Sequence, residues 1–135
     1  MAYRIANKYP VDTKARQAVG VSLPFSGTGV FNSTYVTADQ LKSNLLNYFM
    51  TESGERYMNP AFGGGLKSRI FEQLTSGTFE SIKLELESEI AIYFPSITIL
   101  DLQVYGDEDR NILKVELTYR VDNFNIEDTL DILIQ

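Results

Sequence analysis

The apolar residues of this 135-residue chain change their spacing once, near residue 95, and this change limits the folds open to it. Before that point they recur every three or four positions, which is the spacing of one face of an α-helix. After it they alternate with polar residues, which is the pattern of a half-buried strand. Because helices come first and strands follow, the order predicts an α+β fold in which three helices pack on a small, mostly antiparallel sheet.

Two helices are expected in the first part of the chain. The run Thr37-Ala38-Asp39-Gln40 has the form of a capping box, in which the threonine hydroxyl and the glutamine side chain satisfy free backbone amides at a helix start. An apolar stripe follows at helical spacing, and Ser53-Gly54 predicts the end of this helix. A second, shorter helix should carry Leu66, Ile70 and Leu74, which are spaced by four.

The third helix has the most regular pattern. Thr78 predicts its start, and an almost continuous apolar stripe then places one of its faces in the core. Pro95 predicts its end, because the residue before a proline is disfavoured in the helical region. The stripe consists of Phe79, Ile82, Leu86, Ile90 and Tyr93.

Three strands are expected after Pro95. The segments 97–104 and 113–121 alternate apolar and polar residues, and the polar connection between them is short enough for a hairpin. The alternation slips by one residue at Ile99/Leu100, which predicts a β-bulge, since a slip would otherwise turn every later side chain over. The last strand, 130–134, is expected at the sheet edge or offered to another chain, and its residues Ile132-Leu133-Ile134 do not blunt it against pairing.

Residues 1–35 predict a different organisation. Two prolines and three glycines interrupt this segment too often for a helix. We expect an extended N-terminal arm with short edge strands at Val30-Phe31 and Tyr35-Val36. A single α+β domain should follow over residues 36–135.

The absence of cysteine and histidine removes most catalytic chemistry. Thiol nucleophiles, Ser-His-Asp triads and zinc sites of the Cys/His type are excluded, and we expect no metal and no cofactor. A hydrolase could then use only paired carboxylates, and Glu55 and Glu72 are the acids set among apolar loop residues. Both are better explained as partners for Arg56 or as helix-surface residues. We therefore expect no enzymatic activity, and a murein hydrolase is the enzymatic alternative.

The net charge of −6 is unevenly distributed along the chain. Residues 1–20 carry a net charge of +3, whereas residues 85–135 contain 12 acidic and three basic residues. Such a polarised molecule is either suited to orientation against a neighbour or simply has its solvated faces distributed in this way. The sequence pI of about 4.6 argues against nucleic-acid binding. No apolar run is long enough for a secretion signal or a membrane span, so we expect a cytoplasmic protein without membrane contact.

The loop between the first two helices leaves two questions open. Arg56 either holds this loop against its own backbone or Glu72, or contacts a partner protein directly. The run Gly63-Gly64-Gly65 either allows a tight turn with close packing or opens an anion site at the start of the next helix. We expect the glycine run to form a tight turn, because the residues that follow do not form a P-loop.

The same loop carries a resemblance to a known family. The string Gly54-Glu55-Arg56-x-Met58-x-Pro60-x-Phe62-Gly63, then Phe71-Glu72, then a helix ending Tyr93-x-Pro95, resembles the baseplate wedge proteins of contractile-tailed bacteriophages. These proteins are also called sheath initiators, some have been described as lysozyme-like, and relatives occur in type VI secretion baseplates. The resemblance extends over residues 20–122, which is most of the chain.

The resemblance implies a structural subunit of the tail baseplate, present in the virion and assembled in the host cytoplasm. It implies docking on the helical core bundle of other wedge proteins, contact with tail tube or hub proteins, and six copies in each assembly. It also implies that the terminal strand templates the first ring of sheath subunits by strand addition. The residues implied to form the structural loop are Gly54, Pro60, Phe62, Gly63 and Glu72.

Three groups of residues are implied to bind partner proteins. The family usually ends its long helix with Tyr-Glu-Pro-Arg, whereas this chain has Tyr93-Phe94-Pro95-Ser96, so docking here is apolar or another surface has taken it over. A stand-alone cytoplasmic adaptor is the alternative from a different class. The implied partner-binding residues are Glu55 and Arg56 in the loop, Tyr93, Phe94, Pro95 and Ser96 after the helix, and Leu130, Ile132, Leu133 and Ile134 in the last strand.

Overall fold

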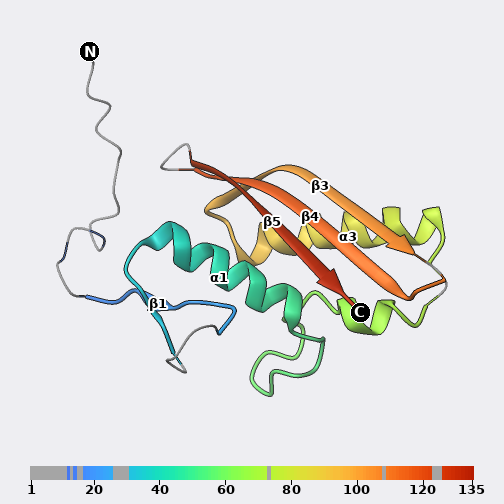
Figure 1. Ribbon diagram of the computed structural model, residues 1–135, viewed down its shortest axis with the longest axis horizontal. Helices are drawn as coiled ribbons and strands as arrows, with labels where there is room; N and C mark the ends of the chain where they lie inside the picture. Colours follow the sequence, from blue (N-terminus) through green and yellow to red (C-terminus); the bar gives the residue numbers. More distant parts are fainter. Residues whose placement is uncertain are drawn as a thin grey trace, which may run out of the picture.

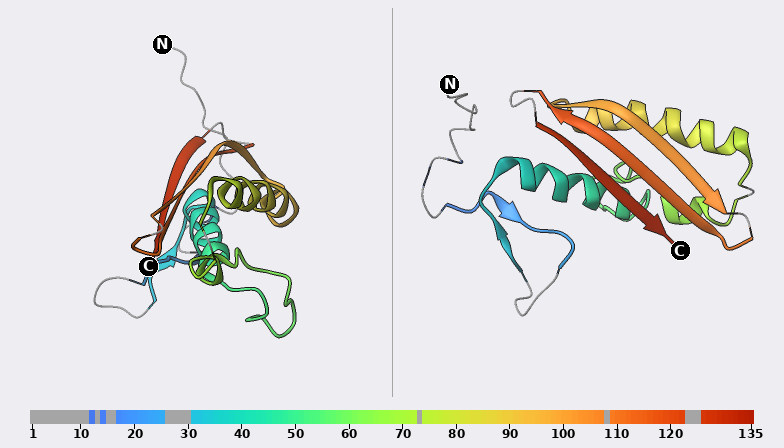
Figure 2. Two further views of the ribbon diagram at one scale, coloured as in Figure 1. Left: turned by 90° about the vertical axis from the view of Figure 1, so that its right-hand side faces the viewer. Right: turned by 45° about the horizontal axis from the view of Figure 1, so that its top comes forward.

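The computed structural model describes residues 12, 14, 17–25, 31–72, 74–107, 109–122 and 126–135. A three-stranded antiparallel sheet is covered on one face by helices, and a two-stranded hairpin lies beside the first helix (Figure 1, Figure 2). The expected α+β fold with three helices is confirmed. In chain order the elements are β1 (Gly20–Val21), β2 (Ser33–Thr34), α1 (Thr37–Met50), α2 (Leu66–Arg69), α3 (Ser76–Tyr93), β3 (Ile97–Asp107), β4 (Ile112–Val121) and β5 (Ile126–Ile134).

The main sheet has the order β3-β4-β5, so β4 is central and β3 and β5 are its edges. Every second residue of β4 is buried, as its alternating sequence predicts. The register of β3 against β4 shifts between Ile99 and Asp101, which confirms the predicted bulge. The pairing of β4 with β5 is uninterrupted from Ile126 to Ile134, and β5 lies at the edge as expected.

Helix α1 begins at Thr37, but the capping-box prediction is wrong. The Asp12 carboxylate accepts hydrogen bonds from the Thr37 backbone N–H at 3.0 Å and from the Thr37 hydroxyl at 2.6 Å. Gln40 instead accepts a hydrogen bond from the Thr34 hydroxyl and donates one to Asn44 at 2.9 Å. A carboxylate distant in the sequence therefore stabilises this helix start, where negative charge is favoured. The sequence around Thr37 could not indicate this cap, because Asp12 lies 25 positions earlier in the chain.

Helices α1 and α2 are shorter than predicted. α1 ends at Met50, before the expected Ser53-Gly54. α2 is a single turn that ends at Arg69, so the predicted helix through Leu74 is wrong. Ile70 and Leu74 are nevertheless buried. Their spacing by four therefore reflects which side of the segment is buried, and not a continuous helix.

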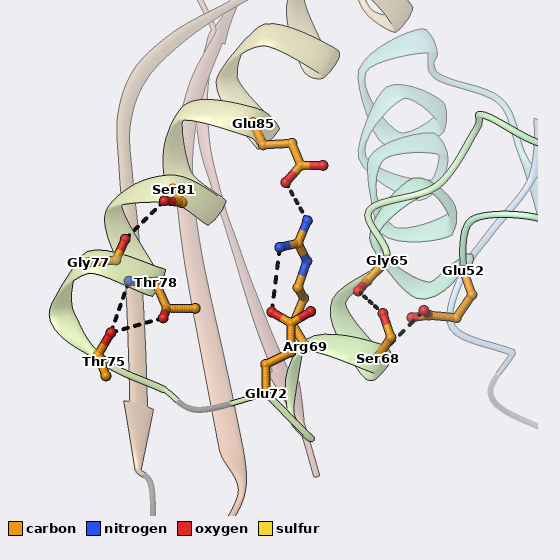
Figure 3. A network of polar contacts seen from close by, with 10 residues as sticks. All are labelled: Glu52, Gly65, Ser68, Arg69, Glu72, Thr75, Gly77, Thr78, Ser81 and Glu85. Carbon is orange, nitrogen blue, oxygen red and sulfur yellow. Dashed lines mark hydrogen bonds and ion pairs between the residues drawn. The ribbon is translucent and has the colours of Figure 1, made fainter.

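Helix α3 starts earlier than predicted. Its cap is Thr75 and not Thr78, because the Thr75 hydroxyl accepts a hydrogen bond from the Thr78 backbone N–H at 3.4 Å (Figure 3). Its apolar stripe faces the sheet, with Ile82, Leu86 and Ile90 nearly inaccessible to solvent. The helix ends at Tyr93, as the following proline predicts.

The N-terminal edge strands lie elsewhere than predicted. β1 pairs antiparallel with β2, whereas Phe31 and Tyr35-Val36 belong to no strand, and Val30 lies outside the described residues. The hairpin approaches α1 closely at Gly20, where an added Cβ would lie 2.3 Å from the Gln40 side chain.

The core lies between the helices and the inner face of the sheet, with Tyr48 near its centre. The Tyr48 ring centroid lies 5.4 Å from that of Phe62 and 5.9 Å from that of Phe94, both in edge-to-face geometry. The Tyr48 hydroxyl donates a hydrogen bond to Glu89 of α3. Burial, followed by this contact, raises the pKa of Tyr48 above its ordinary value.

Candidate docking surfaces

The loop between α1 and α2 projects from the molecule and has a braced base (Figure 1). The Gly54 backbone N–H donates to the Pro60 carbonyl at 2.8 Å, which closes the loop across its neck. At its tip the side chains of Tyr57 and Met58 are 96% and 91% exposed. Sequence reasoning did not single out this pair, although large apolar residues in a loop bounded by turn residues are a usable signal.

The glycine run after this loop forms a tight turn, as expected. Gly63 has φ of +131°, and an added Cβ would lie 2.5 Å from the Thr51 carbonyl oxygen. The start of α2 does not offer an open anion site, because Glu52 already accepts from the Lys67 backbone N–H at 2.7 Å and lies within hydrogen-bond distance of Ser68 (Figure 3). Backbone geometry therefore accounts for these glycines.

Arg56 stacks on an aromatic ring instead of pairing with Glu72. Its guanidinium carbon lies 3.8 Å from the centre of the Phe62 ring, a cation–π geometry that holds the loop against the aromatic cluster. Glu72 pairs with Arg69 at 3.6 Å, and Arg69 also contacts Glu85 of α3 (Figure 3). The proposed Arg56–Glu72 pair is therefore wrong, because Arg69 is the nearer cation.

The two candidate catalytic carboxylates are in unsuitable surroundings for acid catalysis. Glu55 is exposed and accepts from the Glu52 backbone N–H at 3.0 Å, and Glu72 is exposed in its pair with Arg69. A glycosidase acid needs an apolar pocket that favours its protonated form. Neither side chain has one.

The segment after α3 is divided between core and surface. Phe94 is buried, and the Tyr93 ring centroid lies 5.2 Å from that of Phe62. Pro95 is exposed and Ser96 is half-buried. Pro95, Ser96 and the half-buried Tyr93 are therefore accessible to a partner, while the contact of Tyr93 with Phe62 joins this segment to the Arg56 loop.

The last strand presents different groups to the core and to solvent. Leu130, Ile132 and Ile134 are buried under the helices, whereas Leu133 is 55% exposed on the opposite face. The strand pairs with β4 on one side only, so its other edge carries backbone groups that the sheet does not use. The candidate partner contact of β5 is thus its backbone edge, and three of the four predicted side chains serve the core.

A groove of about 1080 Å³ runs beside this free edge. Residues of α1, including Lys42, Leu46 and Met50, line it together with Leu130 and Asp131 of β5. The segments next to β1 and β2 line it from the other side. The Lys42 ammonium lies 2.9 Å from the Asp128 carboxylate, an ion pair that joins α1 to β5 near the start of the strand. Sequence reasoning missed the groove, because its parts are far apart in the chain.

Within the described residues, no cluster of acidic side chains suited to a metal ion is present. Among those residues, no helix has both the length and the apolar character that a membrane crossing requires.

Comparison with known proteins places this chain among baseplate wedge proteins. The family model described as baseplate wedge protein gp25 matches residues 35–125. The baseplate wedge protein gp25 of Enterobacteria phage T4 is 32% identical over 81 residues, which are 60% of this chain and 61% of that protein. The chain thus matches less than two thirds of that relative's length.

Two solved structures share the fold. A chain of the anti-feeding prophage baseplate, a 6-fold symmetrised cryo-EM structure, is 27% identical with a TM-score of 0.61, covering 76% of this chain and 84% of that one. A Geobacter sulfurreducens protein described as a tail lysozyme has a TM-score of 0.63 at 24% identity, covering 73% of this chain and 89% of that one. At that identity the second likeness concerns the fold alone.

The fold and its surfaces first define a class: a small α+β protein with a free sheet edge beside an open groove. The chain belongs to the baseplate wedge protein gp25 family, because the family model covers most of it. It is a baseplate wedge protein of a contractile phage tail or of a related baseplate.

Proposed function

We propose that this protein is a structural, non-enzymatic subunit that docks on other wedge proteins and templates the first ring of sheath subunits by strand addition. The observation that carries the templating step is the free edge of β5 beside the groove. A strand added there would extend the backbone hydrogen bonding of the sheet, and every second side chain would enter the groove. Strand addition therefore supplies both strength and register.

Docking on the wedge core would use the surface around the Arg56 loop and the segment after α3. The exposed Tyr57 and Met58 side chains, together with Pro95 and Ser96, offer apolar and neutral contacts. This composition supports the apolar form of docking over an ionic one. We place six copies around the tail, in the virion, after assembly in the host cytoplasm; the 6-fold symmetrised relative supports this number. Tail tube or hub proteins are further candidate neighbours.

Lysines on the β5 edge test the templating step. The variant Thr129→Lys/Leu133→Lys places two lysines on exposed positions of β5, where edge lysines oppose strand pairing. Sheath nucleation on baseplates carrying it should fall at least about tenfold, roughly 1.4 kcal/mol. The matched control, Gln103→Lys/Tyr105→Lys, makes the same change on the same face of the other edge strand and should nucleate normally. Normal nucleation on the β5 variant, with its fold intact by circular dichroism, would overturn the proposal.

A further inference from the structure

The solvent-facing side of β5 carries two carboxylates that the rest of the described chain leaves unpaired. Glu127 and Asp131 are exposed and four residues apart, so both lie on the face of the sheet away from the helices. Neither forms an ion pair with another described residue. Asp131 also lies directly opposite Glu116 of β4. Because like charges opposed across a strand pair are destabilising, a cation on the free side of Asp131 would relieve this repulsion.

The groove beside β5 has the same sign of charge. Among the described residues that line it, Lys42 is the single cation, and its ammonium is paired with Asp128 at 2.9 Å. Asp39 and Asp131 also line the groove, and neither forms an ion pair with a described residue. The described lining of the groove therefore presents net negative charge to a segment that enters it.

The walls of the groove between these charges are largely apolar. Several large side chains that line it remain open to solvent, among them Phe25, Tyr35 and Met50, with exposed fractions of 58%, 55% and 44%. Exposed apolar surface gathered in a concave site is typical of a surface for a partner. A strand along β5 would direct alternate side chains toward this apolar wall and the others toward the row of carboxylates.

We propose that the strand received by β5 is cationic on one face and apolar on the other, with Lys or Arg residues four positions apart, opposite Glu127 and Asp131. This inference rests on the proposed function, which supplies strand addition at this edge. The spacing follows from the pairing, because one residue of an added strand lies opposite each residue of β5. The positions opposite Leu130 and Ile132 then face the groove and carry apolar side chains.

The same charges disfavour a second copy of this chain as the occupant. Any pair of β5 strands brings two sets of these carboxylates to one edge. In the antiparallel pair centred on Thr129, for example, Glu127 of each copy lies opposite Asp131 of the other. Like charges there destabilise the pair, and Asp128 adds a charge on the inner face. The three acids therefore protect the edge from self-association and select a cationic strand.

Synthetic peptides test the charge pattern on the isolated protein. The probe Val-Thr-Ile-Lys-Phe-Thr-Asn-Lys-Thr matches β5 in antiparallel pairing, and its reversed sequence matches it in parallel pairing. One control has glutamate at both lysine positions. The other exchanges each lysine with the residue before it, which moves both lysines to the face of the phenylalanine at equal composition. By fluorescence anisotropy of labelled peptides, the probe in one of its two directions should bind at least about tenfold more tightly than either control.

Charge reversal on the protein then locates the recognition. The variant Glu127→Lys/Asp131→Lys should prefer the glutamate peptide over the lysine probe, and the neutral variant Glu127→Gln/Asp131→Asn should lose the preference. The matched control, Glu80→Lys/Glu87→Lys, makes the same change of net charge at two acids of α3 that form no ion pair with a described residue. It should keep the preference of the unchanged protein. Circular dichroism checks that each variant is folded.

Absence of binding, equal binding of probe and controls, or an unchanged preference in the Glu127→Lys/Asp131→Lys variant would overturn the inference. Loss of the preference in the α3 variant would overturn it too, because overall charge and not the β5 edge would then attract the peptide. These measurements need no sheath, so their failure would overturn the charge pattern alone. Normal sheath nucleation on the Thr129→Lys/Leu133→Lys variant would overturn the templating proposal and leave the peptide result unaffected.

Discussion

Single residues fix the geometry of the candidate surfaces by steric and electrostatic means. Gly63 is required because its positive φ and its approach to the Thr51 carbonyl leave no space for a side chain. Tyr48 joins the helices because its ring packs in the core while its hydroxyl reaches Glu89. Arg56 orders its loop by stacking on Phe62. Two of these contacts lead to measurable predictions.

Gly63→Ala should lower the free energy of unfolding by about 2–4 kcal/mol, because it adds backbone strain and a clash with a carbonyl oxygen. Gly54→Ala is the matched control: its φ is also positive, at +90°, but no atom lies within 4 Å of the added Cβ. This control should cost about 1 kcal/mol, from conformational strain alone. Urea denaturation measures both, and equal losses would contradict the steric explanation.

Tyr48 should make the protein sensitive to alkali. The folded state raises the pKa of Tyr48 above its usual value of about 10 through burial and Glu89, so the folded state retains the phenol proton longer than the unfolded chain. This stabilisation is complete below about pH 10 and is lost as the pH rises above it, by up to about 1.4 kcal/mol per pH unit. Burial and Asp128 raise the pKa of Tyr119 in the same direction.

Urea denaturation from pH 8 to 11.5 measures this dependence. Tyr48→Phe should show a shallower fall of the unfolding free energy above about pH 10 than the unchanged protein. Tyr57→Phe is the control, since that ring is 96% exposed, and it should retain the full slope. An unchanged slope in Tyr48→Phe would contradict the assignment.

At the scale of elements, side chains from other segments cap the first two helices. α1 is capped by Asp12 of the N-terminal arm, and the single turn of α2 is capped by Glu52 of the preceding loop. Each contact fixes another segment of the chain to the start of a helix. The arrangement thus couples the N-terminal segment to α1, which lines the groove.

Asp12→Ala should destabilise the protein by about 1 kcal/mol, because the first backbone amide of α1 loses its acceptor and the helix start loses a negative charge. Lys14→Ala, an exposed change two residues away, should have almost no effect. Thermal unfolding followed by circular dichroism measures both. An equal melting temperature for Asp12→Ala and the unchanged protein would show that the cap contributes nothing.

At the scale of the whole molecule, the free edge, the groove and the projecting loop are surfaces for other chains. The exposed setting of Glu55 and Glu72 predicts that the purified protein will not clear murein in a zymogram. Lysozyme on the same gel is the positive control. Clearing that is lost in Glu55→Gln would show a carboxylate enzyme and contradict the structural role.

The sequence predicted those parts of the fold that depend on neighbouring residues. The alternation of β4, the bulge in β3 and the end of α3 each follow from side-chain period or from proline, which act within a few positions. The family resemblance was also carried by one local segment, the Arg56 loop, and the family is confirmed. The boundary between arm and domain at residues 35 and 36 stays a prediction.

By itself, then, the sequence determined the order of helices and strands, the edge position of β5 and the exclusion of cysteine and histidine chemistry. Only the tertiary structure decided that Asp12 caps α1, that Glu72 pairs with Arg69, and that a groove lies beside β5. The physical reason is the range of each effect. Period and turn chemistry act along the chain, whereas caps, ion pairs and grooves form between segments that meet only after the core has packed.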